Sequence, residues 1–154
     1  MRRPLDLKAA KQAAYKLLKC RDRSEKEICQ RLKLKGFSQE VIRQAVEHLY
    51  KLNYLDDRRF AKAWVASRLN KPLGIRRIVL ELKQKGIGQD LINEVLAEIS
   101  PTYDEHSAAW DLLKAKFKNL KMNDDDQLRR RIFSFLIRRG FSLSTATQII
   151  EELK

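Results

Sequence analysis

Apolar residues recur along this chain at helical spacing, and one stretch of that pattern occurs three times. Aligned on a glycine, the copies read EICQRLKLKGFSQEVIRQAVEHL, RIVLELKQKGIGQDLINEVLAEI and RIFSFLIRRGFSLSTATQIIEEL, with glycine at Gly36, Gly86 and Gly140. Each copy has isoleucine eight residues before the glycine and leucine four residues before it. A period near 50 residues indicates tandem structural units, in which each unit covers an apolar face of its neighbour.

Each copy predicts one helix that ends at the glycine and a second helix that follows it. Glycine suits the residue after a helix because it adopts the left-handed conformation without a Cβ clash. In the first copy, Ser24 and Glu27 have the spacing of a capping box, which marks a helix start. A further apolar segment precedes each copy and predicts a third helix, as around Tyr15, Trp64 and Trp110.

The predicted fold is therefore all-α, with three tandem three-helix repeats that form an elongated, curved array. The expected units are residues 1–55, 56–101 and 102–154, which we call units 1, 2 and 3. The middle helices should bury isoleucine and leucine, which are Ile28, Leu32, Ile78, Leu82, Ile132 and Leu136. We expect Asp56 to cap the first helix of unit 2, and Asp124 to Asp126 to start the middle helix of unit 3, where acids complement the positive end of the dipole.

The predicted helical array carries a large positive net charge. Its 154 residues include 33 lysines and arginines against 20 acids, for a net charge of +13. Bases outnumber acids by 23 to 12 in residues 1–100 and by 10 to 8 in residues 101–154. Such a field favours a polyanion or an acidic protein surface as the partner.

Candidate chemistry for catalysis is scarce, so we expect no enzyme, no metal site and no cofactor. His48 and His106 are the only histidines, and neither has the spacing of a metal site or a catalytic triad. Cys20 and Cys29 form no CxxC pair, and no glycine-rich phosphate loop is present. The chain also has neither a 20-residue apolar run nor a signal-peptide pattern, so we expect a cytoplasmic protein, as a monomer.

Cations recur on the middle helix of each predicted unit, on the face opposite the buried stripe. A base lies ten residues before each glycine, and in two units another lies three residues before it. With their neighbours, these candidate contacts for an anionic partner, called the basic row below, are Lys26, Lys33, Arg76, Arg77, Lys83, Arg130 and Arg131. A row of bases suits contact with backbone phosphates, although a solvated helix face would look the same. The bases directly before the glycines, Lys35, Lys85 and Arg139, are explained by the dipole at the helix end.

Helix–turn–helix binding of a specific DNA sequence is disfavoured. In that geometry the first residues of the last helix read bases in the major groove. Two of these helices begin with an acid, at Gln39-Glu40 and Gln89-Asp90, which would approach the phosphates. Only the third, from Ser142 to Thr145, is neutral.

Four segments together resemble the RecX regulatory protein family. They are RDRSEKEICQRLKLKGF, NYLDDRRFAKAWVASRLN, GIRRIVLELKQKGI and FSFLIRRGFS, of which YLDD and LKQKGI are the most specific. The resemblance runs from about Lys8 to the carboxyl terminus and implies three helical repeats. It also implies binding to RecA and to its filament on DNA, without enzyme activity, which limits recombination, DNA repair by that route and the SOS response.

Two other functions stay open from the sequence. A general basic DNA-binding module would bind naked duplex as tightly as a RecA filament. A helical scaffold for another acidic protein would bind neither.

Overall fold

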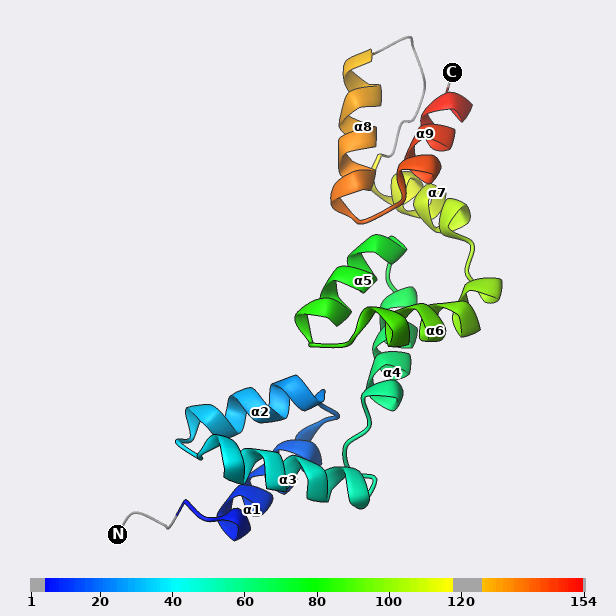
Figure 1. The fold of residues 1–154 in the computed structure, drawn as a ribbon. Coiled ribbons are helices and arrows are strands. Elements are labelled where there is room, and N and C mark those ends of the chain that lie inside the picture. The colour runs from blue at the N-terminus through cyan, green and yellow to red at the C-terminus, as the bar shows by residue number, and fades with distance from the viewer. Residues whose placement is uncertain (1–4, 118–125, 154) are drawn as a thin grey trace.

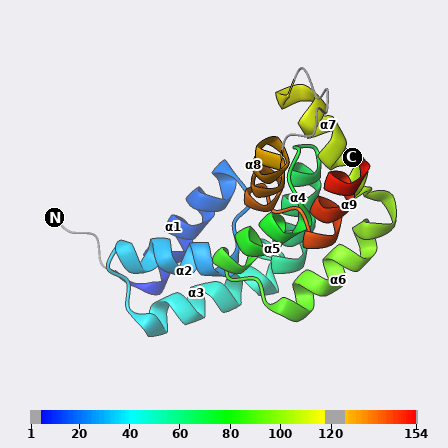
Figure 2. The ribbon, with the colours of Figure 1, turned by 90° about the horizontal axis from the view of Figure 1, so that it is seen from above.

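The computed structural model describes residues 5–117 and 126–153, which form nine α-helices and a short 3₁₀ helix, with no β-strand among them. Figure 1 shows three groups of three helices along an elongated, bent molecule, with the two termini at opposite ends. The α-helices are α1 (Leu7–Cys20), α2 (Glu25–Leu34), α3 (Gln39–Lys51), α4 (Asp57–Leu69), α5 (Ile75–Gln84), α6 (Gln89–Ile99), α7 (Glu105–Lys116), α8 (Asp126–Arg138) and α9 (Leu143–Glu152). The view from above has α1, α2 and α3 on one side and α7 and α9 on the other (Figure 2). The predicted all-α array of three-helix repeats is confirmed.

Side-chain caps start α2 and α4 where the sequence predicts them. Ser24 and Glu27 form the predicted capping box at the start of α2, and Asp56 accepts a hydrogen bond from Arg59 N at the start of α4. Asp104 and Ser142 cap α7 and α9 in the same way. A cap of this kind typically contributes about 1 kcal/mol, because it satisfies an amide that has no partner inside the helix.

The three repeated glycines end α2, α5 and α8 as predicted. Gly36, Gly86 and Gly140 have φ values of +88°, +82° and +85°, in the left-handed region. Any other residue would be strained there, which explains why the same residue type ends all three middle helices. Of the predicted start of α8, Asp126 is the first helical residue, whereas Asp124 and Asp125 lie outside the described residues.

Each unit has a hydrophobic core of its own. The isoleucine and leucine predicted to face inward from each middle helix are all fully buried, as are Leu49 in unit 1, Ile92 in unit 2 and Phe141 in unit 3. Burial of one such side chain stabilises the fold by about 1.5–3 kcal/mol. The prediction that each unit covers an apolar face of its neighbour is wrong, because each core is closed within its own unit, and the units meet through small contacts at their ends.

Candidate interaction surface

Units 1 and 2 meet where the first turn of α2 contacts the last turn of α5. Ser24 is fully buried, and its Oγ donates to the carbonyl oxygen of Lys85 at 2.7 Å. The next amide, Glu25 N, donates to Asp57 Oδ1 of α4 at 2.9 Å. The ammonium of Lys26 donates to the carbonyl of Gln84 at 3.2 Å. Two side chains at the start of α2 thus donate to carbonyls at the end of α5, and the first amide of α2 finds a carboxylate at the start of α4.

Units 2 and 3 meet in the same way, one repeat further along. Gly74 N donates to the carbonyl oxygen of Arg139 at 3.0 Å, and Arg76 N donates to that of Gly140 at 3.1 Å. Between them, Ile75 N donates to Glu105 Oε1 at 3.1 Å. The two junctions therefore use corresponding positions of their units, although only the first includes a serine.

Two of the repeated glycines have a second role at these junctions. A Cβ added to Gly86 would lie 2.6 Å from Cβ of Lys26, and one added to Gly140 would lie 2.3 Å from Cβ of Arg77. No folded protein tolerates such distances, so the absence of a side chain lets the units approach. The middle helices α8, α5 and α2 consequently follow one another end to end, with the C-terminus of each at the N-terminus of the next (Figure 1).

Glu27 adds charge to the junction of units 1 and 2. Its carboxylate is 12% exposed and binds Lys85 Nζ of unit 2 at 2.7 Å and Arg21 at 2.9 Å. Burial by itself would raise the pKa of Glu27, but hydrogen bonds from Arg21, Lys85 and the amide of Ser24 outweigh burial and lower its pKa to about 2. At the other junction, Arg77 occupies the position of Glu27, and its Nε lies 3.3 Å from Glu81 within α5.

We expect the variant Glu27→Gln to lose stability at neutral pH and to approach the wild type in acid. The pKa of folded Glu27 lies below the ordinary value of 4.5, so the ionised carboxylate stabilises the folded chain above that pH. This stabilisation disappears as the pH falls through about 2. The free energy of unfolding of both proteins, measured by urea denaturation across this range, tests the expectation. A difference that stays constant with pH would contradict it.

The structure places the seven residues of the basic row in different surroundings. Lys26 and Arg77 lie at the junctions, each against a glycine of the next unit, and Arg76 belongs to the second junction through its backbone. Lys33 and Lys83 are exposed near the carboxyl ends of α2 and α5. Arg130 and Arg131 are exposed on α8 and line one groove.

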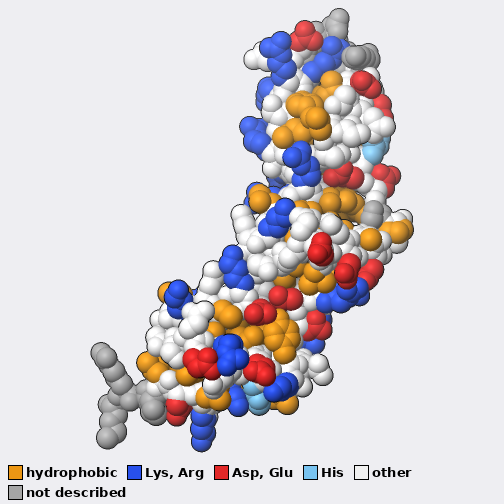
Figure 3. Space-filling view, in the orientation of Figure 1, with side chains coloured by type: hydrophobic (Ala, Val, Ile, Leu, Met, Phe, Trp, Pro, Cys, Tyr) orange, Lys and Arg blue, Asp and Glu red, His pale blue; other side chains and the backbone are white. Residues whose placement is uncertain are grey.

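Among the described residues, some cations elsewhere are paired with acids, whereas five of the seven members of the basic row are not. Arg58 of α4 contacts both Glu94 and Glu98 of α6, and Lys62 binds Glu98 at 2.6 Å. Within residues 5–117 and 126–153, no acidic side chain pairs with five members of the row, which are Lys33, Arg76, Lys83, Arg130 and Arg131. Figure 3 shows lysine and arginine side chains spaced along the edge formed by α8, α5 and α2, on the left of that view. A row of unpaired cations such as this one attracts anions.

The groove that Arg130 and Arg131 line has a volume of about 420 Å³. Lys116 and Arg138 complete its cationic lining, and Phe135 contributes an aromatic ring. The ammonium of Lys116 lies 4.6 Å from the centre of that ring. Four cations beside an aromatic ring are typical of a surface that contacts the backbone of a nucleic acid strand.

Sequence reasoning missed Asp57 and Glu105, which hold the junctions. Each is the first residue of the first helix of its unit and accepts from the first amide of the preceding unit's middle helix. Glu105 also accepts from Ser142 N and Thr145 Oγ1 of its own unit. The available signal was a pair of adjacent acids at the start of each of these helices, Asp56-Asp57 and Asp104-Glu105. The first acid of each pair caps the helix, so the second is free for another role. The corresponding residue at the outer end of unit 1 is Leu7.

Among the residues that the structure describes, no cluster of three or more histidine, cysteine or acidic residues could hold a metal ion. In the same part of the chain, no helix has the length and apolar character needed to cross a bilayer.

Comparison with known proteins gives one consistent match over nearly the whole chain. Models of the first, second and third three-helix domains of RecX match residues 10–49, 56–96 and 103–150. Regulatory protein RecX of Chlorobium phaeobacteroides is 36% identical over 149 residues, which cover 96% of this chain and 95% of the relative. Regulatory protein RecX of Vibrio campbellii is 37% identical over 134 residues, which cover 87% and 84%. The crystal structure of RecX from Lactobacillus salivarius superposes with a TM-score of 0.82 over 96% of both chains at 22% identity, which shows the shared fold.

Proposed function

This chain belongs to the RecX family of regulatory proteins, and we propose that it regulates RecA by binding along the nucleoprotein filament that RecA forms on DNA. The observation that carries the proposal is the row of cations without acidic partners along α8, α5 and α2. A filament repeats its subunits around a polyanionic strand, and an elongated array that repeats its cations matches that target.

The proposed mechanism is binding, without catalysis, by the three units with boundaries at residues 55/56 and 101/102. An array that contacts neighbouring RecA subunits would hinder the subunit motions that accompany ATP hydrolysis. It would thereby limit strand exchange and the coprotease activity behind the SOS response in the cytoplasm. Single exposed ion pairs contribute about 0–1 kcal/mol, so affinity comes from many of them together and falls as salt rises.

The DNA-dependent ATPase of RecA tests this proposal. We expect substoichiometric wild-type chain to lower the rate, and a variant with Lys33, Lys83, Arg130 and Arg131 changed to glutamate to need about 30-fold more protein for half-inhibition. Four contacts of about 0.5 kcal/mol each give that factor. These four residues are chosen because Lys26 and Arg77 pack on Gly86 and Gly140, and reversing them would disturb the junctions.

A matched control variant shows whether inhibition depends on where the cations lie or only on the net charge of the chain. Lys8, Lys19, Lys71 and Lys114 are exposed outside the basic row, and their change to glutamate alters the net charge by the same amount. We expect this control to inhibit like the wild type. Equal loss in both variants would show that the row is not the contact surface. A wild-type chain that leaves the ATPase rate unchanged would show that RecA is not the target.

The groove of unit 3 favours a second candidate, direct binding of DNA. A fluorescent oligonucleotide, free or coated with RecA, distinguishes the two candidates in one buffer. A general DNA-binding module would bind the free strand as tightly as the filament, whereas a RecA regulator would bind the filament more tightly.

A further inference from the structure

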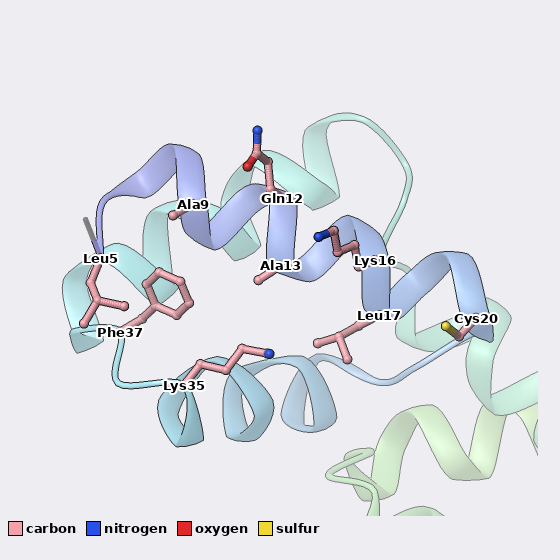
Figure 4. Close-up of a pocket in the computed structure, with 9 residues that line it drawn as sticks. All are labelled: Leu5, Ala9, Gln12, Ala13, Lys16, Leu17, Cys20, Lys35 and Phe37. Atoms are coloured by element: carbon pink, nitrogen blue, oxygen red, sulfur yellow. The ribbon is translucent and has the colours of Figure 1, made fainter. Parts of the chain in front are cut away.

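An apolar groove lies on unit 1, between α1 and the turn that follows α2. Figure 4 shows Ala9, Ala13 and Leu17 of α1 along one side, with Leu5 and Phe37 at one end. The volume of this groove is about 550 Å³, within the range of sites that hold a large side chain or a small ligand. Alanine at two successive turns of α1 leaves the space open, because no longer side chain projects from the helix there.

In the other two units, the base before the repeated glycine lies over an aromatic ring. In unit 2, Lys85 Nζ lies 5.0 Å from the ring centre of Trp64. In unit 3, Arg139 Cζ lies 5.5 Å from the ring centre of Phe135. A cation over an aromatic face is attracted by the ring's electron density, so both arrangements are favourable.

Unit 1 has the base without the ring. Lys35 precedes Gly36 and lines the groove, and within the described part of the chain no aromatic ring lies beneath its ammonium. The residue that corresponds to Trp64, 50 positions earlier, is Ala14, which is fully buried. Ala14 belongs to the core of unit 1 and does not line the groove, so α1 supplies no ring to Lys35 as α4 supplies Trp64 to Lys85.

The charge at the edge of the groove indicates which kind of chain would fill it. Lys16 and Lys35 are both exposed at its edge, and none of the described residues that line it is acidic. A segment with acids beside an aromatic residue would be attracted by these lysines and would place its ring beneath Lys35.

We propose that the groove of unit 1 binds an aromatic side chain from an acidic segment of a partner protein, which would give Lys35 the ring that Trp64 gives Lys85 in unit 2. The partner's ring would lie on Ala9 and Ala13, between Phe37 and Leu17, with Lys35 above it. Its acids would pair with Lys16 and Lys35. This site is separate from the basic row, so it goes beyond the proposed contact with the RecA filament.

Fluorescence anisotropy of a fluorescein-labelled peptide, Glu-Asp-Trp-Leu-Glu-Asp, tests the site in the absence of RecA and DNA. We expect saturable binding to the full chain, weakened about tenfold or more when alanine replaces the tryptophan of the peptide. A peptide with lysine in place of its acids should not bind. Equal binding of the tryptophan and alanine peptides would overturn the proposal.

Variants of the chain locate the bound peptide. Ala13→Trp fills the groove and should abolish binding, and Lys35→Glu should weaken it about fivefold or more by reversing the charge at the edge. Lys19→Glu is the matched control, since Lys19 is exposed on α1 but lies outside the groove and should bind normally. A wild-type affinity in Lys35→Glu and Ala13→Trp would overturn the assignment.

The thiol of Cys20 gives a readout that does not depend on substitution. Cys20 is exposed and lines the end of the groove opposite Phe37 (Figure 4). Bound peptide should slow its alkylation by iodoacetamide, as followed by mass spectrometry, and unchanged alkylation at saturating peptide would contradict the proposal. Sedimentation of the chain alone tests whether a second copy of the chain occupies the groove instead. A dimer that Ala13→Trp abolishes would assign the groove to that second copy and overturn the proposal.

Discussion

The variant Gly74→Ala is expected to release unit 3 from unit 2 while α5 stays helical. Gly74 has φ −74° and ψ 156°, which alanine adopts without strain, so only the contact is affected. A Cβ there would lie 2.1 Å from backbone atoms of Gly140 and Phe141, which cannot turn aside as a side chain can. The clash and the lost bond from Gly74 N to Arg139 O should together cost about 3 kcal/mol.

The two tryptophans of the chain report on this effect separately, because Trp64 belongs to unit 2 and Trp110 to unit 3. In versions that keep one tryptophan each, we expect urea to unfold the Trp110 unit of Gly74→Ala earlier than the Trp64 unit. In the unsubstituted chain the two transitions should lie closer together. Small-angle scattering should show a larger radius of gyration for the variant, since the hinge between the units opens.

Gly88→Ala is the matched control. A Cβ on Gly88 would meet no atom within 4 Å, so the substitution should change stability by no more than about 0.5 kcal/mol. If Gly74→Ala keeps the wild-type unfolding curve and radius of gyration, the end-to-end contact of α8 with α5 does not exist in solution.

The variant Ser24→Ala should show the second large effect, because one hydroxyl serves two units. Ser24 Oγ accepts from Glu27 N within α2 and donates to Lys85 O of unit 2. Alanine removes the cap, at about 1 kcal/mol, and leaves the Lys85 carbonyl without its donor, at about 1–3 kcal/mol more. We therefore expect a loss of about 2–4 kcal/mol in the free energy of unfolding, measured by urea denaturation.

Ser38→Ala separates the two contributions. Ser38 caps α3 by accepting from Val41 N at 3.3 Å, but it is exposed and makes no bond to another unit. Its loss should cost about 1 kcal/mol, and the excess for Ser24→Ala then measures the bond across the junction. Equal losses in the two variants would contradict a stabilising role for that bond.

The fold within each unit could be predicted because its determinants are local. The capping box at Ser24, the left-handed glycine at Gly36 and the buried pair Ile28 and Leu32 all lie within 12 residues of one another. Helix caps and helical periodicity act over that distance, so a single sequence contains the information. Repetition at Gly86 and Gly140 then extended the prediction to the whole array.

The contacts between units could not be predicted. Helical periodicity shows which face of a helix is buried, but not which residues of another unit contact the end of the helix. Lys26 lies on the outward face of α2, as the helical wheel predicts, yet its side chain packs on Gly86 and donates to Gln84. The bond from Ser24 to Lys85 joins residues 61 positions apart. Lys85 was explained by the dipole of its own helix, whereas its ammonium binds Glu27 of unit 1. Whether the basic row is the contact surface stays a prediction.

A middle unit has one junction surface for the unit before it and another for the unit after it, so the length of the array can change by whole units. Unit 2 has both sides: Asp57 and Gly86 face unit 1, and Gly74 faces unit 3. Unit 1 has Leu7 at the position where units 2 and 3 have the acid of their junctions. A second copy of residues 56–101, inserted in the middle of the chain, would find a complementary partner on each side. A chain of four units built in this way would be longer and would use only the two kinds of junction already present.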